Sequence, residues 1–387
     1  MENLTIQSVA NGIILPYRRC RHSTGLGGVL DAKGMFIEKS YLHGGSFEHG
    51  GPYDFDKSTL VKSNDKVIYF GYYLPHWGHF LIDCLGRMWP FVDTEIYYKL
   101  NDYKVAYISN SQEGMYNNCY EFFAALGIKR ERIIHINQTT QFQEVLIPDV
   151  DYTAEPGRTF APQYIQLYDT VAQNILKKHD LKEVEDKFGS IEKVYFTRSE
   201  FRGAKSREVG LSVIDKVFRN GGYNIIAPEK LSLIEQVLIW NNARRIACIN
   251  GTIPLNVIFV TPSASHDKPL TITVLNKMEH THRNLMEYLS LRSNLTSEFV
   301  DVQDVRIKDC SIGDGRGLGP FRIGITDELK AWMEKNDIPT ASELYHENLL
   351  LKKFRYGLMV LVNSPRPWLA QYLPESLRSL ARKFLRK

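Results

Sequence analysis

Residues 193–259 read KVYFTRSEFRGAKSREVGLSVIDKVFRNGGYNIIAPEKLSLIEQVLIWNNARRIACINGTIPLNVIF. The segments 193–199 and 245–250 are short apolar runs that end in polar loops, as strands do. Apolar residues recur at helical spacing over 208–218 and 233–240. This alternation predicts a parallel α/β sheet, which binds its ligands where the carboxyl ends of the strands meet the following loops.

The first of these loops is strongly basic. Within ten residues it carries Arg198, Arg202, Lys205 and Arg207. A basic loop can be a solvated surface, but its place after a core strand and before a predicted helix favours a diphosphate site. Arg198 and Arg207 are the best candidates for neutralising a departing diphosphate, because a guanidinium binds phosphate through two parallel hydrogen bonds.

The second loop follows the strand at 245–250 and contains Asn250, Gly251 and Thr252. Gly251 allows the backbone to come close to a bound group, and the Thr252 hydroxyl is predicted to cap the next helix. A glycine at such a turn is ordinary by itself. It gains weight because it is predicted to lie at the same sheet edge as the basic loop.

A second candidate site lies in the segment PHWGHFLIDCLGRMWPF, residues 75–91. His79 and Asp83 are four residues apart, so a helix places them on one face. A carboxylate orients a histidine ring and stabilises its protonated form, which suits a general base. The alternative is a histidine that packs or caps the helix.

These motifs resemble those of glycosyltransferase family 61. The central pattern of that family is similar to the order of Arg198, Arg207, Glu208, Gln236, Gly251, Leu255, Asn256 and Phe259, and its His-bearing helix is similar to the segment with His79, Phe80, Asp83 and Arg87. The resemblance spans roughly residues 70–277. One position departs from it: the family usually has histidine before the glycine, in a stretch resembling His-Gly-Ala, where this chain has Asn250.

The resemblance implies a GT-B architecture, in which two Rossmann-like domains face each other and the C-terminal one holds the donor nucleotide. It implies inverting transfer from a nucleotide sugar, commonly a UDP-sugar, to a glycan or lipid-linked acceptor, with no cofactor and no obligatory metal. The implied catalytic residues are His79, Asp83 and Arg207. The two loops and the resemblance together give the candidate donor-binding residues Arg198, Arg202, Lys205, Glu208, Gln236, Asn250, Gly251, Thr252 and Asn256.

Within this reading, Glu208 is expected in the first turn of the predicted helix, where the helix dipole favours an acid, and Gln236 is expected to bridge helix to loop. Bacterial capsule, lipopolysaccharide or other surface-glycan synthesis is the expected setting. Two alternatives stay open. One is transfer of another phosphate-linked group on the same two domains, and the other is a non-catalytic nucleotide-sugar-binding subunit, which Asn250 suggests.

Length and composition agree with two domains, since 387 residues with 43% apolar content exceed one compact core. We expect an N-terminal Rossmann-like acceptor domain at 1–180, a nucleotide-sugar-binding domain at 181–345 and a helical tail at 346–387. Residues 1–65 are Gly-rich and predicted to form hairpins. The charged stretch 180–187 is predicted to be a linker or crossover, and residues 291–345 are expected to wrap back over the first domain.

Charge and cysteine content exclude several classes of protein. The chain has 48 Lys and Arg against 44 Asp and Glu, which does not indicate a nucleic-acid-binding surface. Five scattered cysteines favour reduced thiols in the cytosol and give no zinc signature. Asp54 and Asp56, and likewise Asp149 and Asp151, have the spacing of metal-chelating pairs, but turn chemistry explains them better. No signal peptide or apolar run of ~20 residues is recognised.

The last residues, LPESLRSLARKFLRK, have the pattern of an interfacial helix. Its apolar stripe consists of Leu373, Leu377, Leu380 and Phe384, and its cations are Arg378, Arg382, Lys383, Arg386 and Lys387. This pattern favours binding to an anionic membrane surface. The alternative is a helix docked on its own domain or on a second subunit. The sequence therefore predicts a cytoplasmic protein that associates peripherally with the inner face of the membrane.

Overall fold

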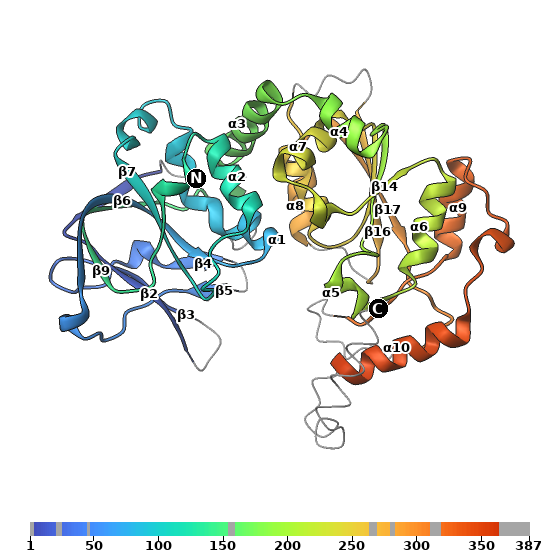
Figure 1. Cartoon of the computed structure of the whole chain (residues 1–387), viewed down its shortest axis with the longest axis horizontal. Coiled ribbons are helices and arrows are strands. Elements are labelled where there is room, and N and C mark those ends of the chain that lie inside the picture. The colour runs from blue at the N-terminus through green and yellow to red at the C-terminus, as the bar shows by residue number, and fades with distance from the viewer. Residues whose placement is uncertain are drawn as a thin grey trace. The chain divides into compact units, whose positions relative to one another are not determined.

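The computed structural model of the chain describes residues 4–20, 25–44, 47–153, 159–262, 269–278, 283–309 and 319–363. The chain forms two compact units. The first consists of Met1–His179 with Ser232–Ile234, and the second of Asp180–Leu231 with Glu235–Lys387. Both mix helices and strands, so the predicted α/β class is confirmed (Figure 1).

A mixed sheet forms the centre of the first unit. Its strand order is β3-β2-β9-β6-β7-β8, and β1 also pairs with β9. The strands are β1 (Ile6–Ala10), β2 (Ile13–Arg19), β3 (Gly25–Leu30), β6 (Val61–Tyr73), β7 (Tyr103–Ser109), β8 (Ile133–His135) and β9 (Thr140–Pro148). Strands β6, β7, β8 and β9 run parallel, whereas β2 and β3 form an antiparallel hairpin at the Gly-rich start. Two small antiparallel pairs are β4 (Leu42–Gly44) with β5 (Phe47–His49) and β10 (Tyr152–Thr153) with β11 (Thr159–Phe160).

The predicted helix of residues 75–91 is a chain of short turns. It consists of α1 (Trp77–His79), a π-helical turn (Phe80–Cys84) and 3₁₀ turns at Leu85–Arg87 and Trp89–Phe91. Tyrosine hydroxyls contribute to the irregularity by donating to its backbone carbonyls: Tyr164 and Tyr168 donate to Leu81, and Tyr152 donates to Asp83. The regular helices are α2 (Asn117–Ala125) and α3 (Pro162–Lys178), and the other 3₁₀ turns are Glu38–Ser40, Lys57–Thr59, Tyr97–Leu100 and Arg130–Arg132.

The second unit is built on the predicted parallel sheet. Its strands are β12 (Lys193–Phe196), β14 (Asn224–Ile226), β15 (Arg245–Ile249), β16 (Leu270–Asn276) and β17 (Leu295–Asp301). Their order is β14-β12-β15-β16-β17, and every pair is parallel. Strand β14, which follows β12 in the chain, pairs on one side of β12, and β15 pairs on the other side. Open α/β sheets bind ligands at such a switch point.

Helices surround this sheet (Figure 1). They are α4 (Leu181–Phe188), α5 (Arg202–Lys205), α6 (Leu211–Asn220), α7 (Leu233–Asn242), α8 (Arg283–Ser290), α9 (Asp327–Lys335) and α10 (Leu349–Asn363), with 3₁₀ helices at Pro228–Lys230, Ile253–Phe259 and Ser342–Tyr345. The charged stretch predicted as a linker is helical, as α4. No helix in the described ranges has both the length and the apolar character needed to cross a bilayer.

Two sequence predictions are wrong here. The helix expected from residue 208 begins at Leu211, because Glu208–Val209 forms strand β13, which pairs with β18 (Phe321–Arg322), and Gly210 turns the chain with φ 95°. Residues 291–345 do not belong to the first unit. They add β17 to the second sheet and place α9 beside it, because their apolar residues complete the second core.

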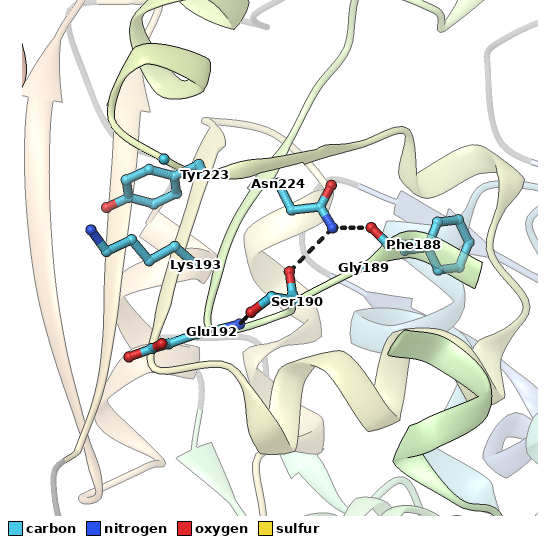
Figure 2. A pocket seen from close by; sticks show the side chains of 8 residues that line it. Phe188, Gly189, Ser190, Glu192, Lys193, Tyr223 and Asn224 are labelled. Atoms are coloured by element: carbon cyan, nitrogen blue, oxygen red, sulfur yellow. Dashed lines mark hydrogen bonds between the residues drawn. The ribbon is translucent and has the colours of Figure 1, made fainter. Parts of the chain in front are cut away.

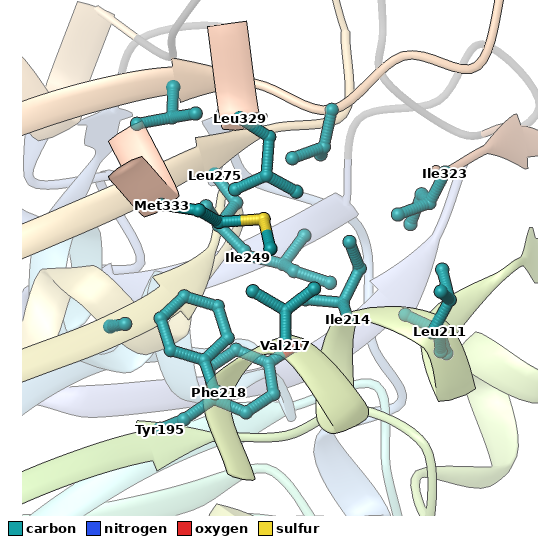
Figure 3. Close-up of a cluster of buried hydrophobic side chains, with 14 of the residues drawn as sticks. Tyr195, Leu211, Ile214, Val217, Phe218, Ile249, Leu275, Ile323, Leu329 and Met333 are labelled. Carbon is teal, nitrogen blue, oxygen red and sulfur yellow. The ribbon is translucent and has the colours of Figure 1, made fainter. Parts of the chain in front are cut away.

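That core fixes the ends of the strands that carry the candidate site. Tyr195 of β12 stacks on Phe218 of α6 with ring centroids 4.3 Å apart. Ile249 and Leu275, near the carboxyl ends of β15 and β16, are fully buried in the same cluster, together with Leu329 and Met333 of α9 (Figure 3). Close packing of this kind leaves the adjoining loops little freedom at their roots.

Candidate active site

The carboxyl edge of the second sheet carries a buried cluster of opposite charges. Arg198, two residues after β12, binds Glu208 through two nitrogens, with Nε 2.9 Å from Oε2 and Nη2 2.9 Å from Oε1. Lys277, the residue after β16, places Nζ 2.7 Å from Oε1 of the same carboxylate. The exposed fraction of the side chain is 16% for Arg198, 8% for Lys277 and 2% for Glu208.

The two cations determine the charge state of Glu208. Burial alone would raise its pKa, but Lys277 and Arg198 outweigh burial and lower the pKa below its usual value. The pKa of Lys277 is lowered by burial, and the anion of Glu208 opposes that shift. A carboxylate placed between two cations stays ionised. One negative charge thus stands against two positive charges at the sheet edge.

Arg207 adds a third cation close to this cluster. Its charge is near enough to Lys277 to contribute to the lowered pKa of that lysine. The Arg207 side chain is exposed, and within the described residues it forms no ion pair. Arg202 and Lys205 lie on α5; Arg202 is exposed and Lys205 is partly exposed. The predicted basic loop therefore supplies one cation inside the cluster and one beside it.

Asn250 and Gly251 directly follow β15. This strand lies between β12, which leads to Arg198, and β16, which leads to Lys277. The Asn250 side chain is fully buried, and within the described part of the chain neither its Nδ2 nor its Oδ1 has a hydrogen-bond partner. Among the described residues other than its chain neighbours, a Cβ built on Gly251 would have only Arg198 Nη1 within 4 Å, at 3.8 Å. Space remains in front of this backbone, and a buried amide without partners is costly. Both features are typical of an edge that receives a polar ligand.

Three other predicted donor-binding residues, Gln236, Asn256 and Thr252, lie on or next to α7 and the 3₁₀ helix at Ile253–Phe259. Gln236 of α7 accepts a hydrogen bond from Asn256 Nδ2 at 2.9 Å, and both side chains are buried. This bond ties α7 to the 3₁₀ helix at Ile253–Phe259. Thr252 precedes that helix with helical backbone angles and makes no side-chain capping bond, so the predicted cap is wrong. The chain is already helical at Thr252, which removes the extended geometry that an N-cap needs.

The histidine site of the first unit has the predicted geometry. His79 Nδ1 lies 2.7 Å from Asp83 Oδ2. The Asp83 side chain is 4% exposed and that of His79 is 26% exposed, so the carboxylate lies behind a ring that solvent reaches. Arg87 does not join the pair, because its guanidinium donates to the backbone carbonyls of Lys39 and Tyr41.

A further histidine, His49 of β5, belongs to the same neighbourhood. Burial lowers its pKa, the charge of His79 lowers it further, and Asp83 acts in the opposite direction. Its ring lies on Tyr72 with centroids 4.1 Å apart, and His76 lies 5.0 Å from the His79 ring. Sequence reasoning missed His49, although the motif HGGSFEHGG at 43–51 marked an unusual loop.

Of the carboxylates considered for metal binding, Asp56 shows the predicted turn chemistry, whereas Asp149 binds residues far away in the chain and does not. Asp56 accepts the amide of Ser58, and Asp149 binds Lys39 and the backbone amide of Thr5. The Asp151 side chain is fully buried, its carboxylate has no hydrogen-bond partner among the described residues, and burial raises its pKa well above the usual value. No group of three metal-ligating side chains is found in the described parts of the chain.

A separate pocket of about 500 Å³ opens at the opposite edge of the second sheet. It is lined by Phe188, Gly189, Ser190, Glu192, Lys193, Gly222, Tyr223 and Asn224, at the amino ends of β12 and β14 (Figure 2). The Asn224 amide there donates to the carbonyls of Phe188 and Ser190. Ligands of open α/β sheets bind at the carboxyl ends, so this pocket is not the candidate site.

A parallel sheet with cations at its switch point is an arrangement on which open α/β domains commonly bind phosphate-bearing ligands. Residues 77–266 match the family model described as Glycosyltransferase 61. The chain belongs to this family, and a glycosyltransferase activity follows from that membership. No curated protein shows significant similarity to the chain.

Lys277 is a member of the charged cluster that sequence reasoning missed. It lies 11 residues beyond the end of the family match and outside the basic loop. Its only sequence signal is its place directly after the apolar strand LTITVLN. The sheet order brings that strand next to β15, and this places Lys277 beside Glu208, which is 69 residues away in the chain.

Proposed function

We propose that the protein transfers a sugar, with inversion, from a nucleotide sugar to a glycan or lipid-linked acceptor. The observation that carries this proposal is the excess of cations around Glu208 at the switch point of the second sheet. Negative charge develops on a nucleoside diphosphate as its bond to the sugar breaks, and nearby cations stabilise that charge. Preorganised charge of this kind is a major source of rate acceleration in enzymes. A UDP-sugar is the proposed donor, and a bacterial surface polysaccharide is the proposed destination.

Each member of the cluster has a distinct part in this proposal. Arg198 and Lys277 hold the diphosphate oxygens, and Glu208 fixes both cations before the donor arrives. Arg207, which is exposed, turns to the same group once it binds. The backbone at Gly251 gives a phosphate room to approach, and the Asn250 amide gains a hydrogen-bond partner from the donor.

The acceptor would be activated by His79 with Asp83. Asp83 binds Nδ1 and orients the ring, and Nε2 takes the proton from the acceptor hydroxyl. The acceptor oxygen then forms its bond to the anomeric carbon as the bond from that carbon to the diphosphate oxygen breaks on the opposite face. This proposal includes a GT-B arrangement, which the α/β character of both units supports.

Binding of nucleotides to the full chain tests the donor site. Titration calorimetry compares UDP with uridine for the wild type, Lys277→Met, and Lys335→Met as the control. Lys335 is also a lysine paired with a glutamate, but its side chain is 71% exposed. We expect Lys277→Met to weaken UDP about 10- to 100-fold, the range for losing a charged hydrogen bond. Uridine affinity stays the same, and Lys335→Met behaves like the wild type.

Equal UDP affinity in wild type and Lys277→Met would remove Lys277 from the site. If the wild type bound no nucleoside diphosphate, the proposed function itself would fail. Transfer from labelled donors then separates the alternatives. Binding without transfer to any acceptor indicates a non-catalytic subunit, whereas a labelled product lacking the sugar indicates transfer of another phosphate-linked group.

A further inference from the structure

Helix α10 (Leu349–Asn363) is apolar on two faces. Its inner face is anchored in the second unit, where Tyr356, Met359 and Val362 pack against Val209 and Ile307. The anchoring is electrostatic as well. Lys352, with a side chain 4% exposed, lies 2.8 Å from Asp304 and 2.7 Å from Glu347. The orientation of the helix about its own axis is therefore fixed.

Its outer face presents large apolar side chains to solvent. The exposed fractions are 81% for Leu350, 50% for Leu351 and 62% for Phe354, and Leu358 and Leu361 continue the stripe with partial exposure, with Leu358 also packing against the inner cluster. These five residues follow the spacing of one side of a helix. Exposed apolar side chains gathered in this way mark a binding surface. We call this set the outer stripe of α10.

Cations border the outer stripe on both sides. At 3.6 residues per turn, Lys353 lies on one margin and Arg355 on the other. Helix α10 contains no acidic residue. Residues 349–387 carry nine of the 48 Lys and Arg and only one of the 44 Asp and Glu, so the remaining chain, with 39 against 43, is net acidic. Three of these nine cations, Lys352, Lys353 and Arg355, lie on α10, and the other six follow residue 363, outside the described residues, as does the predicted interfacial helix.

We infer that the outer stripe of α10 docks on the surface of an anionic membrane. Apolar side chains enter the acyl boundary of such a surface while flanking cations meet the headgroups. A second copy of the chain fits less well, because pairing two outer stripes would bring like charges together. The occupant is therefore a lipid surface. This inference concerns a face that the sugar-transfer proposal does not use.

Flotation of the full chain tests the inference. The vesicles are phosphatidylcholine alone or phosphatidylcholine mixed with phosphatidylglycerol, and the variant is Leu351→Glu with Phe354→Glu. The control is Met286→Glu on α8, since Met286 is 48% exposed elsewhere in the same unit. We expect the wild type and the control to float with the anionic vesicles, more weakly at high salt. The double variant should lose about tenfold or more in partitioning, because acidic side chains oppose both apolar insertion and headgroup attraction.

Three results would overturn this assignment. The double variant could float as well as the wild type, or the wild type could bind zwitterionic vesicles equally well. Alternatively, the wild type could be a dimer without vesicle affinity that the double variant converts to a monomer, which makes a second copy the occupant. UDP affinity, measured on the same samples, shows whether each variant is folded.

Discussion

At the scale of single residues, Glu208 explains why the donor site can hold its cations close together without a ligand. Two positive charges in a buried position repel each other and lose hydration. Glu208 offsets both effects, since it bonds to Arg198 and Lys277 at once. In the proposed reaction, a bound diphosphate would add negative charge to a cluster with a net positive charge, so the cations would be in place before that ligand binds.

The His79 and Asp83 pair leads to a prediction about rate. His79→Gln is expected to lower kcat about 10²- to 10⁴-fold, the usual contribution of a general base, with unchanged affinity for UDP. Asp83→Asn should lower kcat by a smaller factor, because the ring remains but loses the anion that orients it. Steady-state kinetics and UDP titration on the same samples measure both effects.

His135→Gln is the matched control. His135 is in the same unit, and its ring stacks on Tyr107 with centroids 4.8 Å apart. Its removal should leave kcat within about twofold, as expected for a residue outside the reaction. A His79→Gln enzyme with wild-type kcat would show that another group takes the proton, and His49 would then be the next residue to examine.

At the scale of elements, the turn from β13 into α6 positions Glu208. Gly210 has φ 95°, and a Cβ at this position would lie 1.9 Å from the Ile323 carbonyl oxygen. Gly210→Ala therefore combines an unfavourable backbone angle with a steric clash. We expect a loss of about 2 to 4 kcal/mol in the free energy of unfolding, measured by urea denaturation with tryptophan fluorescence.

Gly222→Ala separates the two causes. Gly222 has φ 73°, and a Cβ there meets nothing within 4 Å. It should cost only about 1 to 2 kcal/mol from the backbone angle. If both variants lost the same stability, the close approach of β13 to β18 would have no energetic importance, and the placement of Glu208 would need another explanation.

The sequence was sufficient for elements whose signals are local. Strands β12 and β15 and helix α7 follow from apolar runs and helical spacing, and the His79–Asp83 bond follows from a separation of four residues. The sequence predicts a helix where strand β13 lies, because a strand of two residues is too short to show an alternation of apolar and polar side chains. Its partner β18 comes more than 100 residues later in the chain. Lys277 was missed for a similar reason, since only sheet order brings it to Glu208.

At the scale of the whole molecule, the two candidate sites divide between the two units. The dyad of His79 and Asp83 belongs to the first unit, and the cation cluster belongs to the second. Each unit has its own sheet and its own buried core. A division of this kind lets one unit bind the donor while the other carries the group that activates the acceptor, which is the basis of the proposed reaction.

Hydrogen exchange can show whether donor binding is confined to the second unit. Because Arg198, Asn250 and Lys277 follow β12, β15 and β16, UDP should protect amides at the ends of these strands. At 100 times its dissociation constant, UDP stabilises the native state by about 2.7 kcal/mol, which slows exchange through opening of the second unit by about 100-fold. Amides of β6, β7 and β9 should exchange as they do without ligand. Protection that is strongest in those strands of the first unit would instead place the nucleotide there, and the assignment of donor and acceptor units would have to be reversed.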